Sequence, residues 1–169
     1  HSMQFVGSPY TFSFKQVGTN CGAISPHAAV EAENVVYWMS DGGFFLFDGV
    51  VKQIPCTVQD YVYSDIDDEE QGTTYAGVNL QFAEVSWFYA AQNSDYINRV
   101  VTYNYRENLW TIGTLARTVW APRDIFAYPL AADYDANSTA LAQPTVIGLT
   151  PGRATLYNQE YGSQADGEY

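Results

Sequence analysis

Acidic side chains are the residues that most readily suggest chemistry in this sequence, because clustered carboxylate oxygens can hold calcium. The densest run consists of Asp65, Asp67, Asp68, Glu69 and Glu70. An EF-hand loop that began at Asp65 would need a glycine at its sixth position and a glutamate at its twelfth, where this chain has Glu70 and Ala76. We therefore predict no metal site. The run is expected to be a solvated helix end or a contact surface for a basic partner, and a structural calcium ion is the alternative.

A pair of carboxylates across a cleft would be the machinery of glycoside hydrolysis. The acids that flank expected loops are Glu84, Asp95, Asp124 and Asp133. Nothing in the sequence distinguishes any two of them from ordinary surface charge. We therefore predict no catalytic residue and no enzyme, and glycoside hydrolysis is the enzymatic alternative.

Nucleophilic, nucleotide and zinc chemistry find little support. His27 is the one histidine beyond position 1, and no GxSxG elbow accompanies it, so we expect a packed or capping residue rather than a triad member. No GxGxxG or GxxxxGK loop is present, and we predict no cofactor. Cys21 and Cys56 lack the spacing of a zinc site, which leaves two unlinked structural cysteines or a single disulfide.

Aromatic side chains could stack on sugar rings, and they make up 16% of this chain. Trp38 and Trp87 occupy related positions in a repeated pattern, which predicts packing between repeats. The candidates for an exposed ligand-binding groove are Tyr89, Trp110 and Trp120, of which the two tryptophans lie near expected strand ends.

The elements that would position these residues are mostly strands. Residues 34–39, 44–47 and 50–54 predict a three-stranded meander whose turns are Asp41-Gly42-Gly43 and Asp48-Gly49. Its first strand is apolar on both faces, which predicts a strand that is covered on both sides.

The same pattern returns in residues 83–113, where Trp87 follows Trp38 by 49 positions and further strands are expected at 100–105 and 109–112. A third, weaker copy lies in residues 145–160, with a turn at Thr150-Pro151-Gly152 and a returning strand at Ala154 to Tyr157. Meanders that recur with a period of about 50 residues are typical of β-propeller blades, and the kelch repeat has that length.

The remaining segments give weaker signals. Residues 57–70 predict a short amphipathic helix capped by Thr57, with Val58, Val62 and Ile66 on its apolar face. One strand is expected at 10–16. Residues 116–142 predict one or two irregular strands and an exposed loop.

The predicted fold class is all-β: blade-like antiparallel meanders in a partial or small β-propeller-like domain, with one short helix near 57–70. Residues 1–3 resemble the remnant of a cleaved tag and are left out of the predicted fold. Residues 4–169 are expected to form a single domain, and a fragment of a longer chain, because two and a half blades are recognisable and propellers have at least four.

The net charge and the apolar runs of the chain limit the classes of partner that it can bind. Nineteen acidic against seven basic residues give −12, which repels nucleic-acid phosphates, so we predict no nucleic-acid partner. No run of about 18 apolar residues occurs, and we predict no membrane partner.

Three segments carry a family resemblance. They are VGTNCGAISPHAAVEAENVVYWMSDGGFFLFDG, IPCTVQDYVYSDI and FAEVSWFYAAQNSDYINRVVTYNYRENLWTIGTLARTVW, in that order. Together they resemble the C-terminal part of tailed-phage and prophage virion proteins of the tail or head-tail region. The resemblance implies a structural protein that works by assembly, and the expected partners are other virion subunits and copies of the chain itself. It implies localisation in the virion, after assembly in the bacterial cytoplasm. A glycan-binding or glycan-cleaving phage tail module is the alternative.

Overall fold

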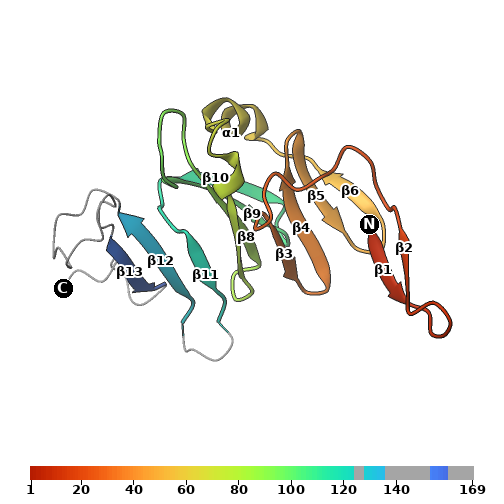
Figure 1. Cartoon of the computed structure of the whole chain (residues 1–169). Helices are drawn as coiled ribbons and strands as arrows, with labels where there is room; N and C mark the ends of the chain where they lie inside the picture. The colour runs from red at the N-terminus through yellow and green to blue at the C-terminus, as the bar shows by residue number, and fades with distance from the viewer. Residues whose placement is uncertain (124–127, 136–152, 160–169) are drawn as a thin grey trace, which may run out of the picture.

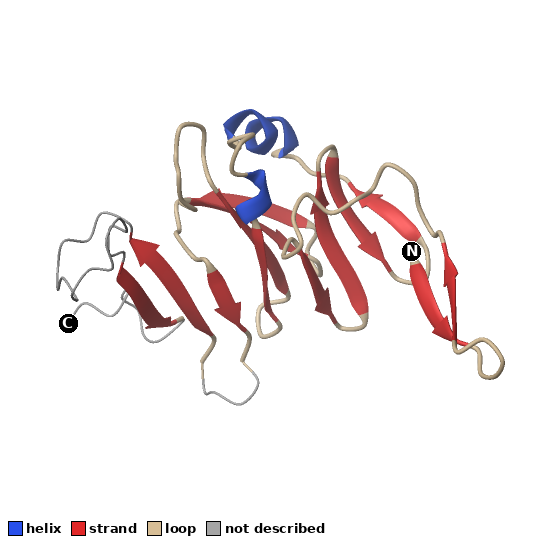
Figure 2. Ribbon diagram, in the orientation of Figure 1, coloured by secondary structure: helices blue, strands red, loops and turns tan. Residues whose placement is uncertain are grey.

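The structure is a computed structural model, and it describes residues 1–123, 128–135 and 153–159. Strands predominate in this part of the chain, accompanied by one α-helix and one 3-10 turn (Figure 2). The described strands form a two-stranded hairpin and three larger antiparallel sheets. The predicted all-β fold class with blade-like meanders is confirmed, and the strands that the structure describes form no closed barrel.

The first sheet has the order β3-β4-β5-β6 and comprises β3 (Ala29–Ala32), β4 (Val35–Ser40), β5 (Gly43–Phe47) and β6 (Val51–Ile54). The predicted meander corresponds to its last three strands. The sequence analysis missed β3, which joins β4 through Glu33 and Asn34. Both residues have positive φ, of 51° and 66°, as a two-residue hairpin turn of the I′ type requires.

The second sheet repeats this arrangement with the order β7-β8-β9-β10. Its strands are β7 (Tyr75–Asn79), β8 (Glu84–Tyr89), β9 (Arg99–Asn104) and β10 (Leu109–Gly113). The register shows how closely the two sheets correspond, because Trp38 pairs with Ala29 in the first and Trp87 pairs with Ala76 in the second. The predicted repeat is therefore structural.

The third sheet has the order β11-β12-β13 and comprises β11 (Val119–Ala121), β12 (Leu130–Asp135) and β13 (Arg153–Asn158). The expected returning strand at 154–157 lies within β13, and β11 and β12 are the irregular strands expected between 116 and 142. The predicted turn at 150–152 and the exposed loop after β12 lie outside the described residues.

The helix is shorter than predicted: α1 spans Gln59–Asp65, and the 3-10 turn η1 spans Gln71–Thr73. Val62 and Ile66 are buried, as their spacing predicts. The predicted Thr57 cap is wrong, because the N-cap residue is Val58 and no side chain caps this end. The helix ends where Ile66 becomes extended and forms an isolated bridge with Ala91.

The sheets lie side by side along the chain, like consecutive blades on an arc (Figure 1). Their first strands are neighbours: β3 lies beside β7, and β7 beside β11. The backbone N–H of Ala76 on β7 donates to the carbonyl of His27, just before β3, at 2.8 Å. This neighbourhood of first strands is the arrangement that lines the axis of a propeller.

Aromatic side chains fill the space between the first two sheets. The ring of Phe44 lies 4.9 Å from that of Trp87 and 4.6 Å from that of Trp110, and Tyr103 lies 4.6 Å from Trp110. Phe88, on the opposite face of β8, stacks on Trp120 of the third sheet at 5.8 Å. The second sheet is therefore packed on both faces, through Trp87 on one side and Phe88 on the other.

Each of three indole N–H groups donates to the backbone of the preceding part of the stack. Trp87 donates to the carbonyl of Ala28 at 3.0 Å, Trp120 to that of Val78 at 2.9 Å, and Trp38 to that of Cys21 at 2.7 Å. Both residues are buried, and the predicted packing between repeats is confirmed for Trp87, whereas Trp38 lies on the outer face of the first sheet against the loop at Cys21. Because an indole has one donor and needs a partner when buried, these bonds fix the distance between neighbouring sheets.

The N-terminal hairpin, β1 (Ser2–Phe5) and β2 (Phe12–Lys15), lies at one end of the stack (Figure 1). β2 falls within the strand expected at 10–16. β1 includes Ser2 and Met3, which the sequence analysis left out of the fold.

Candidate subunit-contact surface

The aromatic candidates do not form a sugar-binding platform. Tyr89 and Trp110 are buried between the first two sheets, and the Trp110 indole donates to the carbonyl of Pro55 at 2.9 Å. Trp120 is half-buried between the second and third sheets. The expectation that Tyr89, Trp110 and Trp120 line an exposed groove is therefore wrong for the first two, because their rings complete the core.

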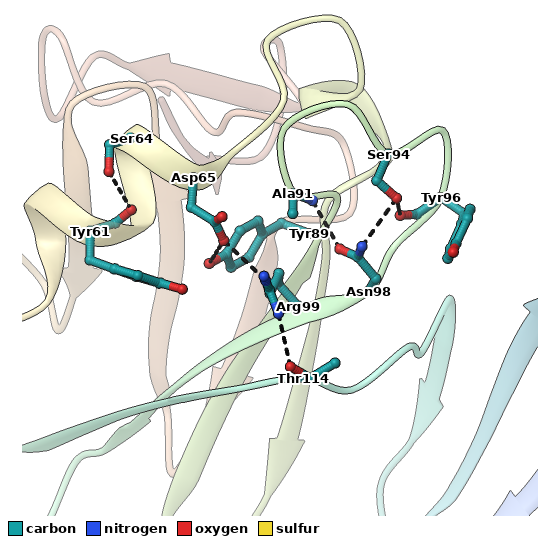
Figure 3. A network of polar contacts seen from close by, with 10 residues as sticks. All are labelled: Tyr61, Ser64, Asp65, Tyr89, Ala91, Ser94, Tyr96, Asn98, Arg99 and Thr114. Carbon is teal, nitrogen blue, oxygen red and sulfur yellow. Dashed lines mark hydrogen bonds and ion pairs between the residues drawn. The ribbon is translucent and has the colours of Figure 1, made fainter.

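Asp65, the last residue of α1, holds the helix end against the second sheet (Figure 3). Its Oδ2 accepts a hydrogen bond from the Tyr89 hydroxyl at 3.1 Å and pairs with Nε of Arg99 at 3.2 Å. Arg99 in turn donates from Nη1 to the Thr114 hydroxyl at 2.9 Å. Burial, with the adjacent Asp65 carboxylate, raises the pKa of Tyr89 well above its usual value. Asp65 is thus a structural anchor rather than a free ligand.

Asp67 fastens the following loop. Its carboxylate accepts backbone N–H bonds from Asn93 and Glu69, both at 2.9 Å, and from Glu70 at 3.3 Å. These bonds, with that from Asn93 the largest contribution, hold the pKa of Asp67 below its usual value. The acidic segment is therefore joined to the β8–β9 loop by the Asp67 carboxylate, which accepts the backbone N–H of Asn93.

The rest of the acidic run faces an open polar hollow. Its lining residues are Ile66, Asp67, Asp68, Glu69, Glu70, Gln92, Asn93 and Asp95. Among the described residues, no group of three or more histidine, cysteine, aspartate or glutamate side chains is placed to hold a metal ion. The run is a solvated acidic surface, and its role as a contact for a basic partner stays a prediction.

The acids considered for hydrolysis are dispersed. Glu84 begins β8 and Asp95 lies in the loop beyond its far end, and the strand between them is about 17 Å long at ~3.3 Å per residue. That exceeds the separation of about 5 to 9.5 Å between glycosidase carboxylates. Asp133 lies on β12 of the third sheet, and Asp124 lies outside the described residues.

His27 and the cysteines have no catalytic setting. The His27 ring is exposed and stacks on Tyr75 at 5.8 Å, so of the two expected roles, packed or capping, the packed one is wrong. Its backbone N–H donates to the Ser25 hydroxyl at 3.1 Å. Cys21 and Cys56 are free and half-buried, which confirms the unlinked alternative.

The N-terminal hairpin carries the surface that the sequence analysis missed. Its register pairs Met3 with Phe14 and Phe5 with Phe12, so the four apolar side chains share one face. Gln4, Ser13 and Lys15 lie on the other face. The four apolar side chains are between 47% and 70% exposed. Their strict alternation with polar residues was the available signal, and it indicates a half-buried strand pair.

A groove adjoins this hairpin on the outer face of the first sheet. Its lining includes Ser2 of the hairpin, Cys21 and Gly22 of the following loop, and Val36 and Trp38 of β4. The corresponding face of the second sheet, which carries Val85 and Trp87, is fully covered by the first. The outer face of the first sheet thus has the composition of an interior surface but is only partly covered.

Comparisons with known proteins do not assign the chain to a family: no protein-family model matches it, and no curated protein does. Within the described part of the chain, no helix is long and apolar enough to cross a membrane.

Proposed function

We propose that this protein is a structural subunit of a tailed-phage virion, of the tail or head-tail region, and that it works through protein–protein assembly. The observation that carries the assembly role is the uncovered apolar face of the N-terminal hairpin, formed by Met3, Phe5, Phe12 and Phe14. The sequence resemblance to virion proteins supports the phage setting. Localisation in the virion, after assembly in the bacterial cytoplasm, belongs to the same proposal.

The physical reasoning concerns how a stack of sheets ends. A repeated array needs terminal units with polar outer faces to stay soluble and separate. An isolated two-stranded hairpin is also marginal in water, and gains stability when its apolar face is covered. This hairpin instead presents two phenylalanines, Phe5 and Phe14, that are each 70% exposed. A subunit contact there buries them.

The arrangement of the chain favours assembly over turnover. Tyr89 and Trp110 are buried and so cannot line a glycan-binding groove, and the described candidate acids Glu84, Asp95 and Asp133 lie on three different elements. The indole bonds and the Asp65 anchor fix the sheets and the helix relative to one another. A rigid scaffold with an apolar end is suited to holding neighbouring subunits at a set spacing.

The assembly role is tested by measuring molar mass with light scattering during size exclusion, over a range of salt and protein concentrations. We expect association that strengthens with salt, because salt screens the −12 charge. The double variant Phe5→Thr/Phe14→Thr should reduce the mass to that of the monomer. The control Gln4→Thr/Ser13→Thr alters the polar face of the same hairpin and should associate like the wild type. A wild-type chain that stays monomeric under all conditions would overturn the assembly role.

The phage setting has a separate test. Antibodies against this chain should label intact virions released by the cells that encode it, as seen by electron microscopy. Purified virions that lack the protein by mass spectrometry would contradict it.

A further inference from the structure

The two ends of the stack of sheets both present apolar faces. At the N-terminal end lies the hairpin face already described. At the other end, the third sheet aligns Val119, Ala132 and Leu156 in one cross-strand row. The next row, Trp120, Ala131 and Tyr157, belongs to the opposite face, since Trp120 stacks on Phe88 of the second sheet. Val119 and Leu156 are 51% and 68% exposed and point away from the second sheet.

We propose that the hairpin face of one copy packs against this outer face of the third sheet in a second copy, head to tail. The inference rests on the proposed assembly function and names its partner. The contact would repeat between chains the sheet-on-sheet packing that joins the first, second and third sheets within one chain. The small side chain of Ala132, between Val119 and Leu156, would face the large rings of Phe5 and Phe14, and such alternation lets facing layers interdigitate.

Charge favours this pairing. Residues 1–30 contain no aspartate or glutamate and one basic residue, Lys15, so they carry +1 with histidine neutral. The rest of the chain therefore carries −13, because the total is −12. Of this charge, residues 113–169, which include the third sheet, carry −3, from six acidic and three basic residues. Packing the carboxylate-free end of one copy on this weakly acidic end of the next avoids the repulsion that two acidic ends would meet. A contact between two hairpins would also leave the Val119 and Leu156 face uncovered.

A head-to-tail contact is heterologous, which means that each copy can bind one further copy at each of its two ends. It generates a ring when the rotation between copies closes, and an open filament when it does not. The N-terminal hairpin and the third sheet lie at opposite ends of the molecule in Figure 1, so one chain can use both contacts at once.

A mixing experiment tests the pairing. The head variant Phe5→Thr/Phe14→Thr has an intact tail, and the tail variant Val119→Thr/Leu156→Thr has an intact head. Threonine retains strand propensity, and circular dichroism with a melting curve verifies that each variant is folded. We expect each variant alone to be a monomer of 18.8 kDa, and an equal mixture to give a species of twice that mass by light scattering.

The outcomes separate the two proposals. If the tail variant alone associates like the wild type, the head-to-tail inference fails and the assembly function stands. If both variants are monomers and the mixture forms no complex, the head-to-tail inference also fails. If the wild type itself is always monomeric, the assembly function fails first.

Discussion

Replacing Trp87 by phenylalanine should destabilise the protein more than the equivalent change at Trp38. Both residues pair with an alanine of the preceding strand and both donate from the indole to a backbone carbonyl. They differ in surroundings. Trp87 is fully buried between two sheets, whereas Trp38 lines the groove beside the N-terminal hairpin.

The magnitude follows from two losses. Truncating a buried tryptophan to alanine lowers the free energy of unfolding by about 3 to 5 kcal/mol. Phenylalanine keeps one of the two rings, so we expect the loss of packing in Trp87→Phe to cost about 1 to 2 kcal/mol. The lost indole hydrogen bond adds about 1 kcal/mol. The cost of losing this hydrogen bond stays small because the Ala28 carbonyl still accepts a hydrogen bond from the Met39 N–H, at 3.2 Å, and is not left without a donor. Trp87→Phe should therefore lower the free energy of unfolding by about 2 to 3 kcal/mol, and Trp38→Phe by about 1 kcal/mol, since water can reach the Cys21 carbonyl.

Urea unfolding followed by far-ultraviolet circular dichroism measures both variants, since this signal does not depend on the tryptophans that are changed. With a urea dependence of about 2 kcal/mol per molar, the midpoint should fall by about 1 M or slightly more for Trp87→Phe and by about 0.5 M for Trp38→Phe. A loss of stability of about 2 to 3 kcal/mol leaves a typical domain folded. Equal shifts for the two variants would refute the reasoning that the interface between the first two sheets is the better-covered face.

Three further changes have defined outcomes. Burial raises the pKa of Tyr63 above its usual value near 10, so the stability that the neutral hydroxyl contributes is complete below about pH 10 and is lost as the pH rises further. Tyr63→Phe should therefore reduce the fall of Tm at alkaline pH. An unchanged slope of Tm against pH would contradict this. Asp67→Asn should lower the hydrogen-exchange protection of the Asn93 amide at neutral pH, whereas full protection would show that the carboxylate does not hold the loop. Gly77→Ala should cost about 1 to 3 kcal/mol, since a Cβ there would lie 2.7 Å from an indole carbon of the third sheet; Gly22→Ala, which meets open space, is the control, and equal stability of the two would count against the packing.

Much of the fold follows from the sequence because strand and turn signals are local. Apolar residues on both faces of β4 and glycines at its turns predicted the first meander, and the spacing of Trp38 and Trp87 predicted the second. The first strand of each sheet was missed because β3 and β7 are short and rich in alanine and glycine. Their place is decided by the neighbouring sheet, which no local pattern contains.

The candidate site could be predicted less well, because burial depends on which sheets meet. Trp110 lies in the last strand of its sheet, where exposure is a reasonable expectation, yet it is covered by Phe44 of the first sheet. Asp65 is one of five similar acids in sequence, and its anchoring role depends on Tyr89 and Arg99, which are 24 and 34 positions away. The carboxylate run thus indicated charge correctly but could not indicate which acid has a structural partner.

The ends of the stack are where the physical requirements of the fold are least satisfied. An interior sheet buries both faces, and the second sheet does so through Trp87 on one side and Phe88 on the other. The apolar side chains on the outer face of a terminal sheet are buried only if a layer with a polar outer surface or another subunit covers them. Here the outermost positions carry Phe5 and Phe14 at one end and Leu156 at the other, all strongly exposed. The net charge of −12 repels other copies at long range, whereas the apolar faces attract them at contact. Because salt screens the repulsion between copies, association should depend on salt concentration more steeply than the stability of the single chain does.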